Sequence, residues 1–270
     1  MTESTVKVAI LDLYDNHPNQ GMRCIKEIVD EFKLPYNIYD VRAKREIPDL
    51  GYDIYISSGG PGDPLVGDGN WEKKYFALID AIHAHNDIAG SKKKYVFFIC
   101  HSFQMVMHHF GLAEITKRKS PSFGVLPVHK THEGLHEEIL QNLQEPFYIV
   151  DSRDYQIVQP KRDKMHKMGA SILCIEKERH HVPLERAIMC VRFNHYFIGT
   201  QFHPEADVQG MIQHYKNPDK VKQTIAAYGD AKYHTMIEGL NDPEKIKKTH
   251  SEILPGFIKH CLRELSLVNK

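Results

Sequence analysis

The residues best suited to nucleophilic chemistry lie at the ends of two apolar runs. Cys100 ends the run YVFFIC (95–100) and is followed at once by polar residues. Such a cysteine is either a buried thiol that fills space or a nucleophile on a strand-to-helix turn. A nucleophilic thiol needs a nearby base and a group that orients the base. The segment GTQFHPEAD (199–207) supplies both, with His203 as the base and Glu205 as a carboxylate that can reach back to it.

Donors for a developing oxyanion are expected in the segment SSGGPGDP (57–64), which no helix or strand interior would tolerate. Gly60 brings a bare backbone N–H close to a bound carbonyl, and the N–H of His101 is the second donor. A helix that begins at Ser102 would point its N-terminus at the thiol and favour the thiolate.

The elements that must position these residues alternate between strands and helices in the first half of the chain. This order predicts parallel strands joined by right-handed crossovers, with a site beyond the carboxyl ends of the strands. The predicted strands are 6–13, 36–41, 52–58 and 94–100, and the predicted helices are 22–32, 72–85 and 102–110.

The second half has a different character. Strands are predicted at 123–131, 147–152, 171–177, 187–194 and 196–202. After residue 207 the pattern is helical, and the last helix is expected to start at Pro255, because proline is favoured at the first helical position. We therefore expect one domain over residues 1–207 with a helical extension over 208–270 that packs on the same domain. This extension either caps apolar surface, which we favour, or docks a partner or a second copy as a homodimer.

The bulk composition excludes several classes of protein. The 270 residues hold 35 Lys+Arg against 35 Asp+Glu, so the chain lacks the broad positive field that binds nucleic acids. The five cysteines are scattered without a CxxC pair, and no apolar stretch reaches the ~20 residues of a membrane helix. We expect a cytoplasmic protein without a secretory signal, a membrane span or a cofactor. The spacing of His129, His132 and His136 is weak evidence for a metal site, since no acidic or cysteine partner completes it.

The segments GGPGDP, FICHSFQ and GTQFHPE, in this order, resemble those of the class I glutamine amidotransferases. The glutaminase part of GMP synthase is the most similar form, and the small subunit of carbamoyl-phosphate synthetase shares the GPGDP run. The resemblance spans roughly residues 5 to 207, and TQFHPE is its most specific part. It implies a flavodoxin-like, three-layer α/β fold with a mainly parallel central sheet.

The resemblance also implies roles for individual residues. Cys100 would form a γ-glutamyl thioester as ammonia leaves, His203 would act as general base and acid, and Glu205 would orient His203. Gly60 and the His101 N–H would form the oxyanion hole.

Substrate recognition is implied for four further residues. Gln104 would touch the bound glutamine, and the segment Ser152, Arg153 and Asp154 would approach its amino-acid end.

Two positions depart from the family pattern. The family has glycine two residues before the cysteine, where this chain has Phe98, which we expect to reshape or block the glutamine pocket. The family's Ser-His pair becomes Ser152-Arg153, and a guanidinium there can hold a carboxylate bidentately.

These observations leave three functions open. The first is a stand-alone amidotransferase subunit that supplies ammonia to a separate synthetase, and the second is a γ-glutamyl peptidase with water as acceptor. The third is a catalytically silent binding or regulatory module. His101 has a rival role as the base, as in the related intracellular-peptidase branch of this fold, but the HPE motif favours His101 as a pocket wall.

Overall fold

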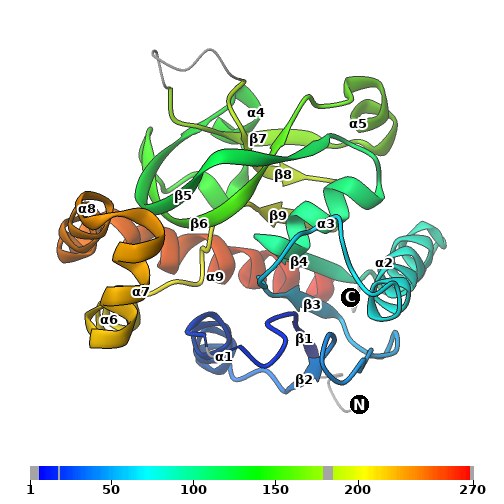
Figure 1. The fold of residues 1–270 in the computed structure, drawn as a ribbon. Coiled ribbons are helices and arrows are strands. Elements are labelled where there is room, and N and C mark those ends of the chain that lie inside the picture. Colours follow the sequence, from blue (N-terminus) through cyan, green and yellow to red (C-terminus); the bar gives the residue numbers. More distant parts are fainter. Residues whose placement is uncertain (1–5, 18, 179–184, 268–270) are drawn as a thin grey trace.

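The computed structural model describes residues 6–17, 19–178 and 185–267. Within these residues the strands form one sheet of nine, in the order β2-β1-β3-β4-β9-β8-β7-β5-β6. Helices cover both of its faces (Figure 1). The expected flavodoxin-like α/β fold is confirmed, and the sheet is mixed, with antiparallel pairings throughout its second half.

The parallel half of the sheet is built from apolar strands that are buried on both faces, as the sequence predicts. Its exception is β2, an edge strand with exposed positions. These strands are β1 (Val8–Asp12), β2 (Tyr36–Asp40), β3 (Ile54–Ser57), β4 (Tyr95–Ile99) and β9 (Phe197–Thr200). All four pairings among them are parallel, so their carboxyl ends lie at one edge of the sheet.

The antiparallel half extends the same sheet beyond β9. Its strands are β8 (Ile188–Arg192), β7 (Ser171–Glu176), β5 (Glu114–Lys130) and β6 (Phe147–Val158). Strand β5 begins nine residues before the predicted start at 123, because its polar, largely exposed first part pairs with the far half of β6. The hydrogen bonds of that pairing join backbone groups, and this part of the sequence has no apolar pattern that would predict a strand.

Two apolar layers hold the helices on the sheet. Side chains of β1 alternate between them: Val8 and Ile10 belong to one, Ala9 and Leu11 to the other. The first layer is covered by α1 (Gly21–Glu31) and α9 (Pro243–Leu267), and the second by α2 (Trp71–Asp87) and α3 (His101–His109). The shorter helices α4 (His132–Leu135), η1 (Glu138–Leu140) and α5 (Arg162–Met168) lie in the connections of the antiparallel half.

Helix α9 is longer than predicted, because Pro255 lies inside it and not at its first position. An internal proline costs roughly 3 kcal/mol. Buried residues on both sides of it, including Ile253 and Phe257, pack in the same apolar layer and offset that cost.

Three further helices follow β9, and Figure 1 shows the last of them, in orange, beside β5. They are α6 (Val208–Lys216), α7 (Pro218–Tyr228) and α8 (Asp230–Asn241). Asn217 caps α7 by accepting from the N–H of Asp219 at 3.0 Å, directly before Pro218. Phe123, Val150, Met236 and Leu240 belong to a separate apolar cluster beneath these helices. The division of the chain at residue 207 stays a prediction. No helix in the described ranges is both long and apolar enough to cross a bilayer.

Candidate active site

Cys100 lies on a sharp turn between β4 and α3. Its backbone has φ 48° and ψ −99°, a strained conformation for a residue other than glycine. Ser102 stabilises the turn, since its hydroxyl accepts from the N–H of Ile99 at 2.9 Å and donates to the carbonyl of Ser57 at 2.9 Å. The Cys100 N–H donates to the carbonyl of Thr200 on β9 at 2.8 Å. The turn therefore fixes the sulfur at the carboxyl edge of the parallel strands.

His203 lies between Cys100 and Glu205. Its Nδ1 is 2.9 Å from Oε1 of Glu205, which is only 1% exposed, and the imidazole lines the same cavity as the Cys100 thiol. Burial lowers the pKa of His203, but the charges of Glu205 and Cys100 outweigh burial and hold this pKa well above its usual value. The sequence separates the sulfur and the imidazole by a hundred residues, and the fold brings them together.

The two residues expected to donate to the oxyanion, Gly60 and His101, line the same cavity as Cys100. Gly60 packs so closely that a Cβ there would lie 2.4 Å from the carbonyl oxygen of Leu13, so a residue with a side chain would force the loop to move. Arg42 holds the same loop by donating to the carbonyl of Pro61 at 2.7 Å. His101 begins α3, and burial together with the charge of Arg42 lowers its side-chain pKa to about 4. The His101 imidazole is therefore neutral near pH 7.

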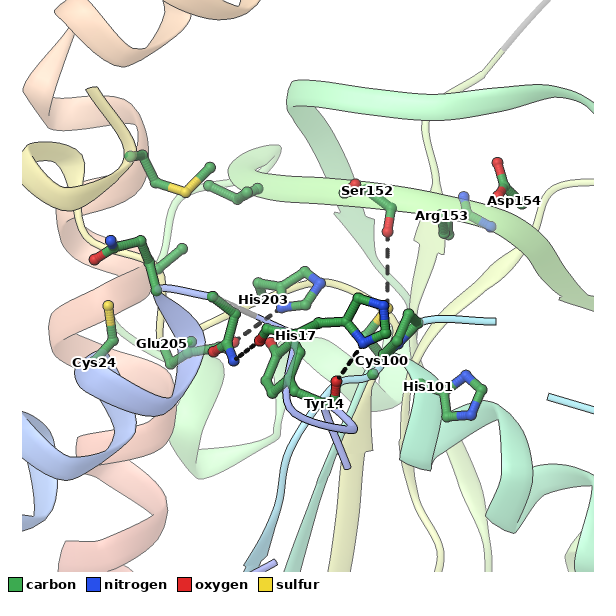
Figure 2. A pocket seen from close by; sticks show the side chains of 18 of the residues that line it. Tyr14, His17, Cys24, Cys100, His101, Ser152, Arg153, Asp154, His203 and Glu205 are labelled. Atoms are coloured by element: carbon green, nitrogen blue, oxygen red, sulfur yellow. Dashed lines mark hydrogen bonds and ion pairs between the residues drawn. The ribbon is translucent and has the colours of Figure 1, made fainter. Parts of the chain in front are cut away.

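A cavity of about 410 Å³ opens at this edge of the sheet. Figure 2 shows His203 and Glu205 on one side of Cys100 and His101 on the other. All the site residues predicted from the sequence line it: Gly60, Cys100, His101, Gln104, Ser152, Arg153, Asp154, His203 and Glu205. His17 and Asn19, from the loop after β1, line it as well.

Gln104 is linked to the thiol through a second amide. Its Nε2 donates to Oε1 of Gln201 at 3.0 Å, and Nε2 of Gln201 donates to the sulfur of Cys100 at 3.7 Å. Gln201 was not among the predicted site residues, although this fully buried residue belongs to the specific TQFHPE segment.

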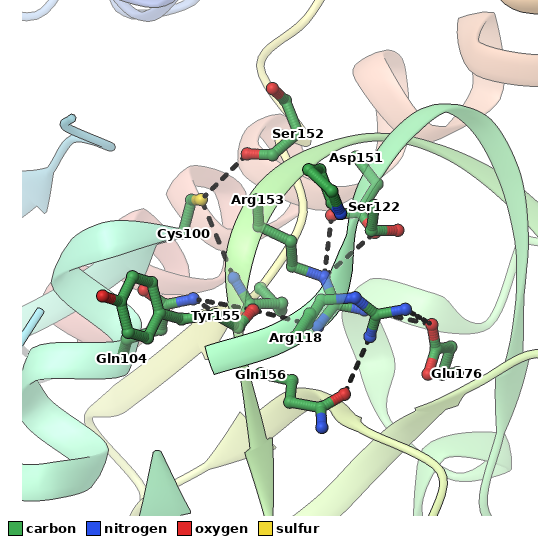
Figure 3. A network of polar contacts seen from close by, with 12 residues as sticks. Cys100, Gln104, Arg118, Ser122, Asp151, Ser152, Arg153, Tyr155, Gln156 and Glu176 are labelled. Atoms are coloured by element: carbon green, nitrogen blue, oxygen red, sulfur yellow. Dashed lines mark hydrogen bonds and ion pairs between the residues drawn. The ribbon is translucent and has the colours of Figure 1, made fainter. Parts of the chain in front are cut away.

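The segment Ser152–Asp154 divides between the cavity and the interior. The carbonyl of Ser152 accepts from the Cys100 sulfur at 4.0 Å, and Asp154 is exposed. Arg153 departs from the expectation, because its guanidinium points into the interior (Figure 3). It pairs with Asp151 at 3.0 Å and with Glu176 at 3.3 Å, and its side chain is 1% exposed. A guanidinium held by two buried carboxylates is not available to a substrate carboxylate.

Phe98 does not block the cavity. It is fully buried and packs edge-to-face on Phe193 and Phe197, at ring-centroid distances of 5.7 and 5.8 Å. It lies opposite Gly199 in the β4–β9 pairing and is absent from the cavity lining. The expectation that Phe98 reshapes the pocket is therefore wrong.

Several lining residues had no signal in the sequence. Tyr14 follows β1, and burial, Glu205 and Cys100 raise the pKa of its hydroxyl well above the usual value. Cys24 lies on α1, and burial raises the pKa of its thiol to about 12, so this second sulfur in the cavity stays protonated. Met211, Tyr215 and Tyr228 come from α6 and α7. Among the described residues no group of three His, Cys, Asp or Glu side chains is arranged to hold a metal ion.

The sequence of the chain is similar to that of one protein family. The family model described as Glutamine amidotransferase class-I matches residues 9–217. No curated protein sequence matches the chain.

Several solved structures have the same fold. A glutamine amidotransferase from Thermotoga maritima is 17% identical with a TM-score of 0.68, covering 99% of this chain and 100% of that one. A protein from Thermoplasma acidophilum, described as a candidate GMP synthase subunit, is 16% identical with a TM-score of 0.62, and the coverage is again 99% and 100%. The glutaminase domain of Trypanosoma brucei CTPS with bound acivicin is 13% identical with a TM-score of 0.58, covering 96% of this chain and 94% of that domain.

Proposed function

Because the chain belongs to the class I glutamine amidotransferase family, we propose that it hydrolyses a γ-glutamyl amide through a thioester on Cys100. The observation that carries this proposal is the position of His203 between the Cys100 thiol and the Glu205 carboxylate, inside one cavity. This arrangement contains a nucleophile, a base and a group that orients the base.

The acylation step uses these residues in order. With the proton of the Cys100 thiol on His203, whose pKa is raised, the sulfur attacks the γ-carbonyl carbon to form a C–S bond. The backbone N–H groups of Gly60 and His101 stabilise the oxyanion. The C–N bond then breaks as the amide nitrogen takes the proton back from His203, and ammonia leaves.

Deacylation repeats the same chemistry with water. His203 takes a proton from a water molecule, and the oxygen of that water attacks the thioester carbon. The C–S bond then breaks to release glutamate, and the sulfur takes the proton from His203 to become a thiol again. Glu205 keeps Nδ1 of His203 engaged throughout, so the other ring nitrogen faces the reaction. As part of the same proposal, the ammonia passes to a separate synthetase, and the protein acts in the cytoplasm.

The alternative of a catalytically silent module rested on Phe98. Since Phe98 packs in the core and not in the cavity, nothing in the cavity favours this alternative.

Labelling with a glutamine-analogue electrophile tests the proposed function. Diazo-oxo-norleucine should modify Cys100 in the wild type and leave Cys100→Ala unmodified, as measured by mass spectrometry of peptides. Cys24→Ala is the matched control, because Cys24 lines the same cavity but keeps its proton. Labelling should survive in this control. A wild type that is neither labelled nor able to release glutamate from glutamine would contradict the proposal.

A further inference from the structure

The cavity continues past the triad, on the side away from the oxyanion donors. Figure 2 shows Glu205 and Cys24 on the opposite side of Cys100 from His101. In the proposed reaction His203 returns its proton to the amide nitrogen, so the leaving group must lie on the His203 side. Ammonia as the leaving group would need almost no space there.

The same cavity is lined by an apolar wall, which we define as Met211, Tyr215 and Tyr228. Helix α6 begins at Val208, a few residues after His203, so Met211 and Tyr215 follow shortly after the HPE motif in the chain. Met211 and Tyr215 are four residues apart on this helix and therefore share one face.

The wall is held rigidly by its contacts. Tyr228 stacks on Phe123 with ring centroids 4.3 Å apart and an angle of 5°, and Tyr215 meets the edge of the same ring at 5.4 Å. The hydroxyl of Tyr233 donates to the carbonyl of Tyr215 at 3.0 Å, which fixes α6 against α8.

The wall also reaches the thiol. Burial and the charge of Asp154 raise the pKa of Tyr228, while the nearby Ser152 side chain lowers it. Ser152 in turn accepts from the Cys100 sulfur through its carbonyl. Tyr228 therefore stands one residue away from the reacting atom. It also lies beyond residue 217, where the family match ends.

We propose that the wall is a leaving-group subsite, and that the protein accepts, besides glutamine, γ-glutamyl amides whose nitrogen carries an apolar or aromatic group. This inference rests on the proposed thioester hydrolysis. The bonds are the same: the C–N bond breaks, the amine leaves with the proton from His203, and water releases glutamate from Cys100. An aromatic group against the wall is removed from water, and only this part of the substrate distinguishes the amide from glutamine.

Two matched substrates test the subsite in the full-length protein. γ-Glutamyl-phenethylamide and γ-glutamyl-ethylamide release alkylamines of similar basicity, but only the former carries a ring. We expect kcat/KM, measured as glutamate release, to be about tenfold higher for the phenethylamide. Equal values, or turnover of glutamine alone, would overturn the subsite and leave the proposed function standing. Inertness toward all three compounds would overturn the proposed function itself.

Variants of the wall residues test whether these residues cause the preference for the phenethylamide. Tyr228→Ala and Met211→Ala should each lose most of the preference for the phenethylamide, measured as the ratio of kcat/KM for the phenethylamide to that for the ethylamide. Tyr228→Phe keeps the ring and should keep the preference, which makes it the matched control for Tyr228→Ala. An equal loss on all substrates in the alanine variants would show that the wall has only a structural role.

Discussion

Phe98 and Gly199 face each other across the β4–β9 pairing, and the glycine makes room for the phenyl ring. A Cβ at position 199 would lie 3.1 Å from the Cβ of Phe98 and 2.6 Å from Cδ2 of Phe103. The bulky residue two positions before the nucleophile is thus accommodated by the neighbouring strand. Neither Phe98 nor Gly199 is among the residues that line the cavity.

This relationship predicts that Gly199→Ala destabilises the protein. The added methyl group overpacks the core, and we expect the free energy of unfolding in urea to fall by about 1–3 kcal/mol. Gly256→Ala is the control: it lies inside α9, its new Cβ would be 3.6 Å from Ile139, and alanine favours the helix. This control should be neutral or stabilising. A Gly199→Ala protein as stable as the wild type would contradict the packing argument.

The sequence predicts the parallel half of the fold because apolar strands and amphipathic helices leave clear periodic patterns there. It predicts the triad for a related reason: Cys100 and His203 end neighbouring strands, and the carboxyl ends of parallel strands share one edge. Local patterns are therefore sufficient where topology alone brings residues together.

The remaining features depend on contacts between residues distant in the chain, which no local sequence pattern predicts. Alternation along a strand predicts that Ser152 and Arg153 face opposite sides of the sheet. It does not predict the carboxylates that hold Arg153, which are Asp151 on the same strand and Glu176 on β7. Similarly, helical spacing predicts α6 and α7, but not which face of each meets the cavity. The polar start of β5 is specified by backbone pairing with β6.

Glu205→Gln should impair catalysis and lower the pKa of His203. The charge of Glu205 is the largest influence that raises this pKa against burial. Loss of the orienting carboxylate should reduce kcat/KM for glutamine by about 10²–10⁴-fold.

The same variant should change the pH dependence of stability. Since the pKa of His203 is raised in the folded state, its charge stabilises the protein fully below about pH 6.5, and this stabilisation is lost as the pH rises through the raised pKa. The difference in unfolding free energy between wild type and Glu205→Gln should therefore be larger at about pH 6 than at about pH 9. A difference that does not change with pH would argue against an imidazolium held by Glu205.

His101→Gln should make the protein more resistant to acid. The folded-state pKa of about 4 lies below the value of 6.5 for a free histidine, so the unfolded chain binds more protons between these values. Stability that is present near neutral pH is lost as the pH falls through this range, by up to roughly 3 kcal/mol. Urea unfolding at several pH values should show a shallower loss for the variant.

Activity separates the two roles considered for His101. If His101 contributes only its backbone N–H, His101→Gln should keep the pH profile of kcat/KM for glutamine. If its imidazole were the base, activity would collapse by orders of magnitude.

The buried charges behind Ser152 predict a loss of stability in Arg153→Met. Its guanidinium is buried and pairs with Asp151 and Glu176 (Figure 3). The guanidinium of Arg118 lies 3.1 Å from the same Glu176 carboxylate. Removing one cation leaves buried carboxylate charge uncompensated, and the free energy of unfolding should fall by about 3–5 kcal/mol. Arg45→Met is the control, because Arg45 pairs with Asp68 at the surface and should contribute only about 0–1 kcal/mol.

A second substitution distinguishes lost charge balance from lost packing. Adding Asp151→Asn to Arg153→Met removes the nearer uncompensated carboxylate while keeping its shape. The double variant should therefore regain part of the lost stability, which is a non-additive result expected for groups in direct contact. Additive losses would instead mean that Arg153 stabilises the strand through its packed hydrocarbon stem. Because the carbonyl of Ser152 next to Arg153 contacts the Cys100 thiol, labelling of Cys100 by diazo-oxo-norleucine should slow in the single variant and recover partly in the double variant.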